Sequence, residues 1–261
     1  MAGDVGVTAG RRPVAVVTGA GRGIGAATAR LLAEDGWELV LLDRGADDPA
    51  IPYPLATRQE LEAVAAACKG IAVLGDVREQ ADLDAAVTTA VDTFGGLDAA
   101  VSAAGVMGSG GEAWRVPDAT WDAVVGVNLE GVWRLARAAV PSLLARDEPR
   151  QGRFVAVASV AGMTGIPLLA AYAAAKHGVV GLVRSLAAEL GPHGVTANVV
   201  SPGSTDTDML LATASIYGLT DASEFAVHHP VGRLVRPTEV AGLIRWLVGP
   251  DSSGITGAVL P

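Results

Sequence analysis

Three side chains in the second half of the chain have types and spacing suited to proton transfer: Ser159, Tyr172 and Lys176. Tyr172 and Lys176 are four residues apart, so on a helix they share one face and the ammonium stands beside the phenol. An adjacent cation stabilises a phenolate and lowers the pKa of Tyr toward that of a general base. In isolation this spacing usually marks a solvated helix face, but here the Tyr lies in a run of alanines and Ser159 follows a predicted strand. We therefore predict an acid–base site.

A glycine-rich turn near the start of the chain has the context of a phosphate-binding loop. Thr18 ends an apolar strand-like run, and the sequence Gly-Ala-Gly-Arg-Gly-Ile-Gly leads directly into a helical pattern. Glycines there allow a tight turn and close backbone approach, so that a pyrophosphate can bind the N–H groups at the start of the helix. The residues predicted to bind a dinucleotide in this turn are Gly19, Gly21, Arg22, Gly23, Ile24 and Gly25.

Acidic residues follow the next two predicted strands. Asp43 comes 18 residues after Gly25, where a carboxylate accepts hydrogen bonds from the ribose hydroxyls and repels a 2′-phosphate, so NAD is favoured over NADP. Arg44 beside it weakens this preference, and Asp43 as a plain loop cap is the alternative. Asp76 and Val77 end the third strand; Asp76 either binds adenine or caps the helix that follows.

Apolar runs of strand length alternate with helical stretches along the whole chain, as in parallel strands joined by crossover helices. The strands are unbroken Val, Ala and Leu rather than alternating, which predicts burial on both faces. We predict an α/β fold with a single doubly wound parallel sheet of about seven strands and helices on both faces. The predicted strands are 14–18, 38–42, 71–74, 99–102, 153–158, 196–201 and 257–260, and the predicted helices are 23–34, 80–94, 118–144, 171–190 and 238–248.

Composition bounds the remaining possibilities. The chain has 261 residues with 28 acidic and 19 basic side chains, a net charge of −9, which gives no basic face for nucleic acid or an anionic membrane. The apolar runs are too short to span a membrane, the single Cys indicates a reduced, cytoplasmic setting, and the four His show no metal-ligand spacing. We expect residues 1–12 to be a disordered tail and residues 13–261 to form one dinucleotide-binding domain.

Taken together, these motifs resemble the short-chain dehydrogenase/reductase family over nearly the whole chain, with Asn128 in VNLEG and Pro202-Gly203 after the sixth strand as further matches. The resemblance implies that Tyr172 is the acid–base group, Ser159 orients the substrate oxygen, Lys176 holds the ribose, and Asn128 completes a proton relay. It also implies a homotetramer, and a few further residues after Pro261. One departure is Ser102-Ala103-Ala104-Gly105, where the family has Asn-Asn-Ala-Gly. Further cofactor contacts implied by the resemblance are Ala103, Ala104, Gly105, Tyr172, Lys176, Pro202, Gly203, Thr205 and Thr207.

A narrower resemblance lies in the inserted loop 44–58, which carries three prolines. It is similar to the mycofactocin-coupled branch of the family, whose members keep their nicotinamide bound and pass electrons to the redox peptide cofactor mycofactocin. A proline-stiffened loop after the ribose-binding strand can fold over the adenosine half of the cofactor at little ordering cost. A surface loop without a role is the alternative.

We therefore interpret the protein as an oxidoreductase that transfers a hydride between an apolar secondary alcohol or ketone and a tightly held NAD. Residues 204–230 are the predicted substrate lid, with apolar side chains that would bury the alcohol. These side chains are Met209, Leu210, Leu211, Ile216, Tyr217 and Phe225. The alternatives are an ordinary NAD-exchanging reductase of a 3-oxoacyl thioester or steroid, and a nucleotide sensor without enzymatic activity.

Overall fold

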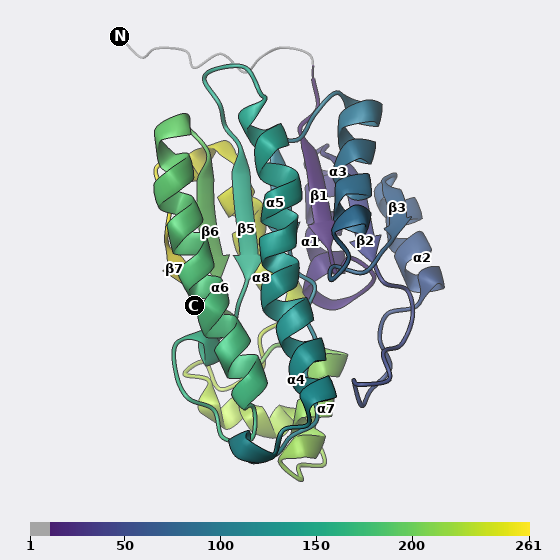
Figure 1. Cartoon of the computed structure of the whole chain (residues 1–261), viewed down its shortest axis with the longest axis vertical. Coiled ribbons are helices and arrows are strands. Elements are labelled where there is room, and N and C mark those ends of the chain that lie inside the picture. The colour runs from purple at the N-terminus through teal and green to yellow at the C-terminus, as the bar shows by residue number, and fades with distance from the viewer. Residues whose placement is uncertain (1–10) are drawn as a thin grey trace.

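A computed structural model describes residues 11–261 and contains one seven-stranded parallel sheet. The strand order β3-β2-β1-β4-β5-β6-β7 confirms the predicted doubly wound α/β fold (Figure 1). Every predicted strand is present, with ends that agree within two residues. The strands are β1 Val14–Thr18, β2 Glu38–Asp43, β3 Ile71–Leu74, β4 Ala99–Ser102, β5 Arg153–Val157, β6 Thr196–Val200 and β7 Val259–Leu260.

Helices cover both faces of the sheet. Apolar residues of α3, α5 and α6 form one core with the strands, and those of α1, α2 and α8 form a second core on the opposite face (Figure 1). Because helices cover both faces of the sheet, the ends of the strands are the part that they leave uncovered. The helices are α1 Gly23–Glu34, α2 Arg58–Cys68, α3 Gln80–Phe94, α4 Asp118–Val125, α5 Gly131–Leu144, α6 Ala170–Leu190, α7 Asp208–Ile216 and α8 Pro237–Val248.

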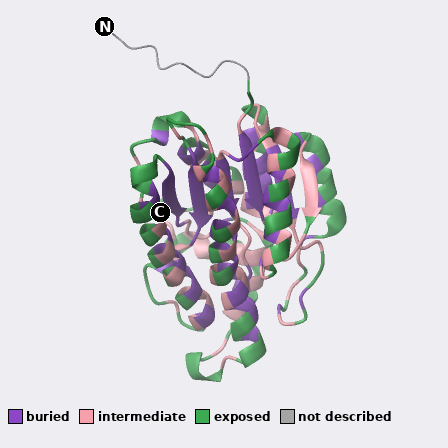
Figure 2. Cartoon of the chain, turned by 45° about the horizontal axis from the view of Figure 1, so that its top comes forward, coloured by how far each residue is buried: buried purple, intermediate pink, exposed green. Residues whose placement is uncertain are grey.

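The central strands are buried on both faces, as their unbroken apolar sequences predict (Figure 2). The prediction is wrong for both edge strands: the residues of β7 are half-buried, as are those of β3 except Leu74, which is exposed. β3 lies at the edge of the sheet, where only one neighbouring strand, β2, pairs with it. Apolar sequence alone does not distinguish an edge strand from a central one.

The predicted helix 118–144 is interrupted. A π-helical segment, Gly126–Glu130, separates α4 from α5 and contains Asn128. One wider turn shifts the backbone hydrogen-bonding register, and such turns are frequent at functional sites. The continuous helical pattern of the sequence did not reveal it.

The predicted tail 1–12 lies outside the described residues except for Arg11 and Arg12. These two residues are held to the fold, because Arg11 pairs with Asp98 at 2.7 Å and Arg12 with Glu38 at 2.8 Å. Within residues 11–261, no helix combines the length and the apolar character needed to cross a membrane.

The strand order reverses between β1 and β4, which is the point where sheets of this kind leave a crevice beyond the carboxyl ends of the strands. The glycine-rich turn follows β1 at this edge, Asp43 ends β2, and Ser159 follows β5. Helix α7 and its flanking loops gather at the same end of the molecule (Figure 1). The topology therefore brings most of the predicted site residues to one edge.

Candidate active site

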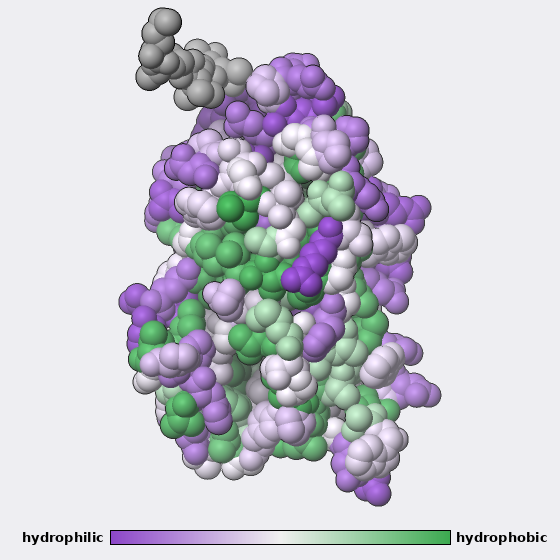
Figure 3. All heavy atoms as spheres, turned by 90° about the vertical axis from the view of Figure 1, so that its left-hand side faces the viewer, coloured by the Kyte–Doolittle hydropathy of each residue, from purple (hydrophilic) through white to green (hydrophobic). Residues whose placement is uncertain are grey.

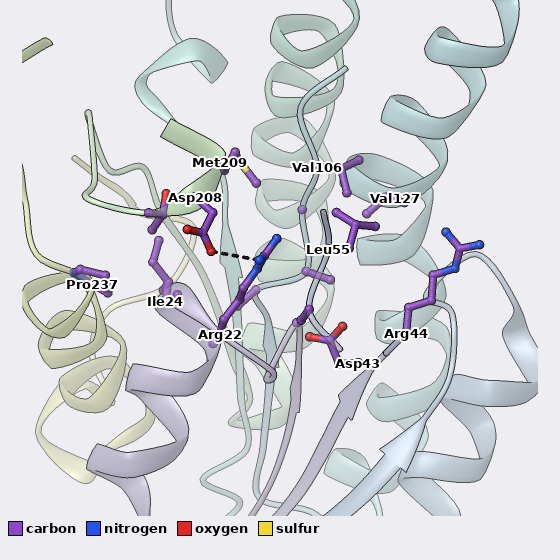
Figure 4. A pocket seen from close by; sticks show the side chains of 18 of the residues that line it. Arg22, Ile24, Asp43, Arg44, Leu55, Val106, Val127, Asp208, Met209 and Pro237 are labelled. Carbon is purple, nitrogen blue, oxygen red and sulfur yellow. Dashed lines mark ion pairs between the residues drawn. The ribbon is translucent and has the colours of Figure 1, made fainter. Parts of the chain in front are cut away.

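A cavity of about 900 Å³ opens at the carboxyl ends of the strands. Its walls come from the glycine-rich turn, the ends of β2, β3 and β4, the inserted loop 44–58 and the start of α7 (Figure 4). Most of the predicted cofactor contacts line it. The predicted residues that line the cavity are Gly19, Arg22, Gly23, Ile24, Gly25, Asp43, Arg44, Asp76, Val77, Ala103, Ala104, Gly105 and Thr207.

Two positions of the glycine-rich turn exclude any side chain. A Cβ on Gly19 would lie 2.6 Å from the Cα of Ala104, and one on Gly25 would lie 2.0 Å from the carbonyl oxygen of Gly19. Gly19 also has a φ of +66°, which favours glycine. The turn therefore packs directly on the backbone of the Ser102–Gly105 segment, so this contact does not need the two amides that the segment lacks.

Asp43 is tied to the glycine-rich turn. Its Oδ2 accepts a hydrogen bond from the backbone N–H of Gly21 at 2.8 Å. Burial raises the pKa of the Asp43 carboxyl, and hydrogen bonds from the backbone N–H groups of Gly21, Arg44 and Gly45 act in the opposite direction. The carboxylate thus lies inside the cavity wall, where the sequence predicted a ribose contact, and part of its hydrogen-bonding capacity fixes the turn.

Ser159, Tyr172 and Lys176 lie close together and are not part of the cavity lining, although the Lys176 ammonium lies next to Gly105, which is. The Lys176 Nζ atom is 5.5 Å from the centre of the Tyr172 ring and donates to the carbonyl of Val157 at 2.9 Å. Ser159 begins a short 3₁₀ turn, where its Oγ accepts from the N–H of Ala161 at 3.1 Å. The Ser159 hydroxyl also lies near enough to the phenol of Tyr172 to lower the pKa of that phenol. The sequence spacing therefore does bring these three groups together.

The protein groups around Tyr172 together do not lower the pKa of its phenol, contrary to the expectation from the sequence. Burial raises the pKa of the phenol to about 12, more than the Ser159 hydroxyl lowers it. Burial also lowers the pKa of the Lys176 ammonium to about 8. Both shifts have one cause, since a site without water disfavours the charged form of either group. The i, i+4 spacing of Tyr172 and Lys176 predicts that they are neighbours but does not predict how far burial shifts their pKa values.

Asn128 is fully buried in the π-helical segment, and its side-chain amide is hydrogen-bonded to backbone groups. Its Nδ2 donates to the carbonyls of Val106 at 2.8 Å and Val124 at 2.9 Å, and its Oδ1 accepts from the N–H of Val106 at 3.3 Å. The amide thus fixes the loop after β4, in which Gly105 and Val106 line the cavity.

The inserted loop 44–58 extends farther than the predicted cover over the adenosine half. Its Tyr53 hydroxyl accepts a hydrogen bond from the N–H of Met107 at 2.9 Å, and its buried Ile51 packs with Val106 and Ala171. Tyr53 and Tyr172 belong to the same apolar cluster. The loop therefore runs from the end of β2 to Tyr172, one of the predicted catalytic residues, and the sequence analysis did not identify Tyr53 as part of the site.

Arg22 connects the glycine-rich turn with two covering segments. Its guanidinium forms an ion pair with Asp208 of α7 at 2.9 Å and donates to the carbonyl of Pro54 in the inserted loop. Figure 4 shows the side chain extending from the turn into the cavity toward Asp208. This contact joins residues far apart in the sequence, so no local pattern could predict it.

The predicted lid 204–230 divides into two parts. Met209 and Leu211 line the cavity, whereas Tyr217 packs edge-on against Phe225 and donates its hydroxyl hydrogen to the carbonyl of Pro167 at 2.7 Å. Ile216 faces Gly110. The start of α7 therefore faces the site, and Asp221 and Ala222 from the later part of the lid also line the cavity.

The other predicted residues have structural partners. Asp76 accepts from the N–H of Arg78 at 2.9 Å and pairs with its guanidinium at 2.6 Å, but it does not cap α3, whose N-cap residue is Glu79 and lacks a side-chain cap bond. Thr207 caps α7, and Thr205 bonds to the carbonyl of Gly203 at 3.1 Å. The predicted residues outside the cavity lining are Gly21, Asn128, Ser159, Tyr172, Lys176, Pro202, Gly203 and Thr205.

The shape of the cavity suits a dinucleotide. Its volume lies in the upper part of the range for ligand sites. At one end the first turn of α1 presents backbone N–H groups, because Arg22, its N-cap residue, directs its side chain elsewhere. Asp43 lies at the ribose position, so the residues present fit NAD.

Comparisons with known proteins agree with this geometry. Residues 19–261 match the family model described as Enoyl-(Acyl carrier protein) reductase. The chain is 37% identical to (-)-trans-carveol dehydrogenase of Rhodococcus erythropolis over 95% of each chain. It is 41% identical to the monensin polyketide synthase putative ketoacyl reductase of Streptomyces virginiae, over 95% of this chain and 94% of that one. The crystal structure of carveol dehydrogenase from Mycobacterium avium in complex with NAD superposes with a TM-score of 0.91 at 31% identity and 96% coverage of both chains.

Proposed function

Since the chain belongs to the short-chain dehydrogenase/reductase family of oxidoreductases, we propose that it transfers a hydride between a small apolar secondary alcohol or ketone and a tightly held NAD, with mycofactocin as the external electron acceptor. The observation that carries this proposal is the joint geometry of Ser159, Tyr172 and Lys176 next to a dinucleotide-sized cavity. The carveol dehydrogenases among the matches support an alcohol as substrate.

The roles of the residues follow from their surroundings. Tyr172 takes the hydroxyl proton of the alcohol, and the neighbouring Ser159 holds the substrate oxygen. Lys176 places a positive charge 5.5 Å from the centre of the Tyr172 ring, and Tyr53 belongs to the same apolar cluster as that ring. When bound, the oxidised nicotinamide would supply the hydride acceptor, and its positive charge before hydride transfer would favour the phenolate of Tyr172. Met209 and Leu211 make the neighbouring wall apolar.

Retention of NAD is supported by the inserted loop. The loop is anchored at Tyr53, which accepts a hydrogen bond from Met107, and at its end, where Thr57 and Glu60 form the capping box that starts α2. A cover with this many partners opens rarely, so a ligand beneath it leaves slowly. A cofactor that stays bound needs an external acceptor for its electrons, and mycofactocin is the acceptor that the loop resemblance implies.

The test is a gentle purification followed by denaturation and identification of the released nucleotide. We expect NAD to be released in near-stoichiometric amounts. We also expect alcohol oxidation to be fast with an artificial electron acceptor and slow with free NAD alone. Protein that is purified without nucleotide and turns over free NAD efficiently would contradict retention, and protein that never binds NAD would overturn the whole proposal.

We expect Asp208→Asn to accelerate exchange of bound NAD. The Arg22–Asp208 pair is partly exposed, and such pairs contribute about 1 kcal/mol at most, so the exchange rate should rise by about 2- to 5-fold. The measurement is the release of bound NAD into an excess of labelled NAD. Asp206→Asn is the matched control, because Asp206 also lines the cavity but Arg22 pairs with Asp208. An equal increase of the NAD exchange rate in both variants would show that the Arg22–Asp208 ion pair does not hold α7 over the cavity.

A second candidate function is NAD-dependent reduction of a 3-oxoacyl thioester with free exchange of the cofactor. The matched family description and the putative ketoacyl reductase from Streptomyces virginiae favour it. A thioester on a carrier protein needs access to Tyr172, and residues of the inserted loop and of α7 line the neighbouring cavity. Turnover of a 3-oxoacyl thioester model compound with free NADH, faster than any alcohol oxidation, would favour this function.

We also propose that the protein is a homotetramer. Trp121 of α4 and Trp133 of α5 are each more than two-fifths exposed, on helices that the family resemblance assigns to subunit contacts. Figure 3 shows hydrophobic residues gathered across the middle of the face at the β7 edge of the sheet. Exposed apolar surface of this kind commonly lies in subunit interfaces. Sedimentation analysis of the purified protein tests the proposal.

A further inference from the structure

A cluster of alternating charges lies at the adenosine end of the cavity, formed by Arg44, Asp48, Asp76 and Arg78. The buried Asp48 carboxylate accepts from Arg44 at 2.7 Å and from Arg78 at 2.8 Å. Asp76 accepts from Arg78 at 2.6 Å and lies 3.5 Å from the Nε of Arg44. Each arginine is thus held between two carboxylates, and all four residues line the cavity.

The position of Arg44 makes this cluster relevant to cofactor choice. It directly follows Asp43, and an arginine beside the ribose-binding position is the group that accommodates the 2′-phosphate of NADP. Here the Arg44 guanidinium is turned away from Asp43 in the cavity (Figure 4) and is bonded to Asp48. With Asp43, this cluster holds two arginines against three carboxylates, and Arg22, the further cation near Asp43, is itself paired with Asp208, so a phosphate would meet a net negative charge.

We propose that Asp48, supplied by the inserted loop, is a specificity-determining residue that withholds Arg44 from a 2′-phosphate and so excludes NADP. The inference rests on the proposed function, because it concerns the same dinucleotide site. It assigns the loop a second role besides covering the cofactor. It also predicts that Asp43 is not sufficient for the selectivity, since an arginine stands beside it.

The test compares Asp43→Asn, Asp48→Asn and the double variant. Asparagine at position 48 keeps an oxygen that can accept from the N–H of Ala50, so the loop turn is preserved. Each protein is equilibrated with an equimolar mixture of NAD and NADP, then denatured, and the released nucleotides are quantified. A hydrogen bond to a charged group contributes enough to shift a binding ratio by about 10- to 100-fold. We expect a shift of about 10-fold toward NADP for Asp48→Asn, and a larger than additive shift for the double variant.

Two controls separate the mechanism from its alternatives. Asp47 lies one residue earlier and accepts from the N–H of Leu55 at 2.7 Å, so Asp47→Asn removes the same charge from the loop without freeing Arg44. Adding Arg44→Gln to Asp48→Asn should return the ratio of bound NADP to bound NAD to the wild-type value. An unchanged NADP-to-NAD ratio in Asp48→Asn, or an equal shift in Asp47→Asn, would overturn the inference. Wild-type protein that binds neither nucleotide would instead overturn the proposed function.

Discussion

Replacing Tyr172 by Phe should lower kcat/KM for alcohol oxidation by about 10²- to 10⁴-fold, the range that a positioned acid–base group contributes. The aromatic ring remains in its apolar cluster with Tyr53, so we expect the fold and the amount of bound NAD to be unchanged. The measurements are steady-state oxidation with an artificial electron acceptor and quantification of the nucleotide released on denaturation.

Tyr217→Phe is the matched control for this change. It also removes one phenol hydroxyl from a hydrogen bond, at 2.7 Å to the carbonyl of Pro167, but that hydroxyl lies in the outer part of the lid. We expect it to leave kcat/KM nearly unchanged. Equal losses in both variants would indicate a general effect of the lid on the site, and full activity of Tyr172→Phe would refute the assigned base.

The pH dependence of the same reaction follows from the raised pKa of Tyr172. Burial holds the phenol protonated, and oxidation requires the phenolate, so kcat/KM should increase as the pH rises. Between about pH 6 and 8 we expect an increase of up to about 10-fold per pH unit. Reduction of the ketone requires the protonated phenol and should lack this rise. A pH-independent oxidation rate in wild-type protein would show that Tyr172 is already ionised or is not the base.

The strands and the catalytic spacing could be predicted from the sequence because both are local patterns. Unbroken apolar runs mark buried parallel strands, and an i, i+4 pair on a helix fixes which side chains are neighbours. The edge position of β3 could not be predicted from the sequence, because it depends on how the strands pair in the folded sheet. The start of α2 was readable in principle, since Thr57 and Glu60 have the spacing of a capping box.

The parts of the site that the sequence did not reveal are those made by contacts between distant segments. Asp48 with Arg78, and Arg22 with Asp208, are joined only after the inserted loop and α7 fold over the same cavity. The pKa of Tyr172 belongs to the same class, because its direction depends on how completely the phenol is buried. Spacing identifies the chemical groups, whereas their protonation depends on the packing around them.

Replacing Asn128 by Leu should destabilise the protein by about 3 to 5 kcal/mol. The substitution removes an amide that bonds to three buried backbone groups, the N–H and C=O of Val106 and the C=O of Val124. Each unsatisfied buried group costs about 1 to 3 kcal/mol, and part of the cost is recovered as the π-helical segment relaxes. In a chain of this size the loss lowers Tm by about 10 °C, which calorimetry can measure.

Activity separates a local role of Asn128 from a general loss of stability. Asn198 is the matched control, because it is equally buried and its amide bonds to the C=O of Ile255 and the N–H of Ala258, at the end of the sheet near β7. Asn198→Leu should lower Tm by a similar amount and retain activity at temperatures where it is folded. Asn128→Leu should lose activity there as well, because Val106 lines the cavity and depends on this amide for its position. If both folded variants retain the same activity, Asn128 contributes only to stability and the loop after β4 needs no such anchor for catalysis.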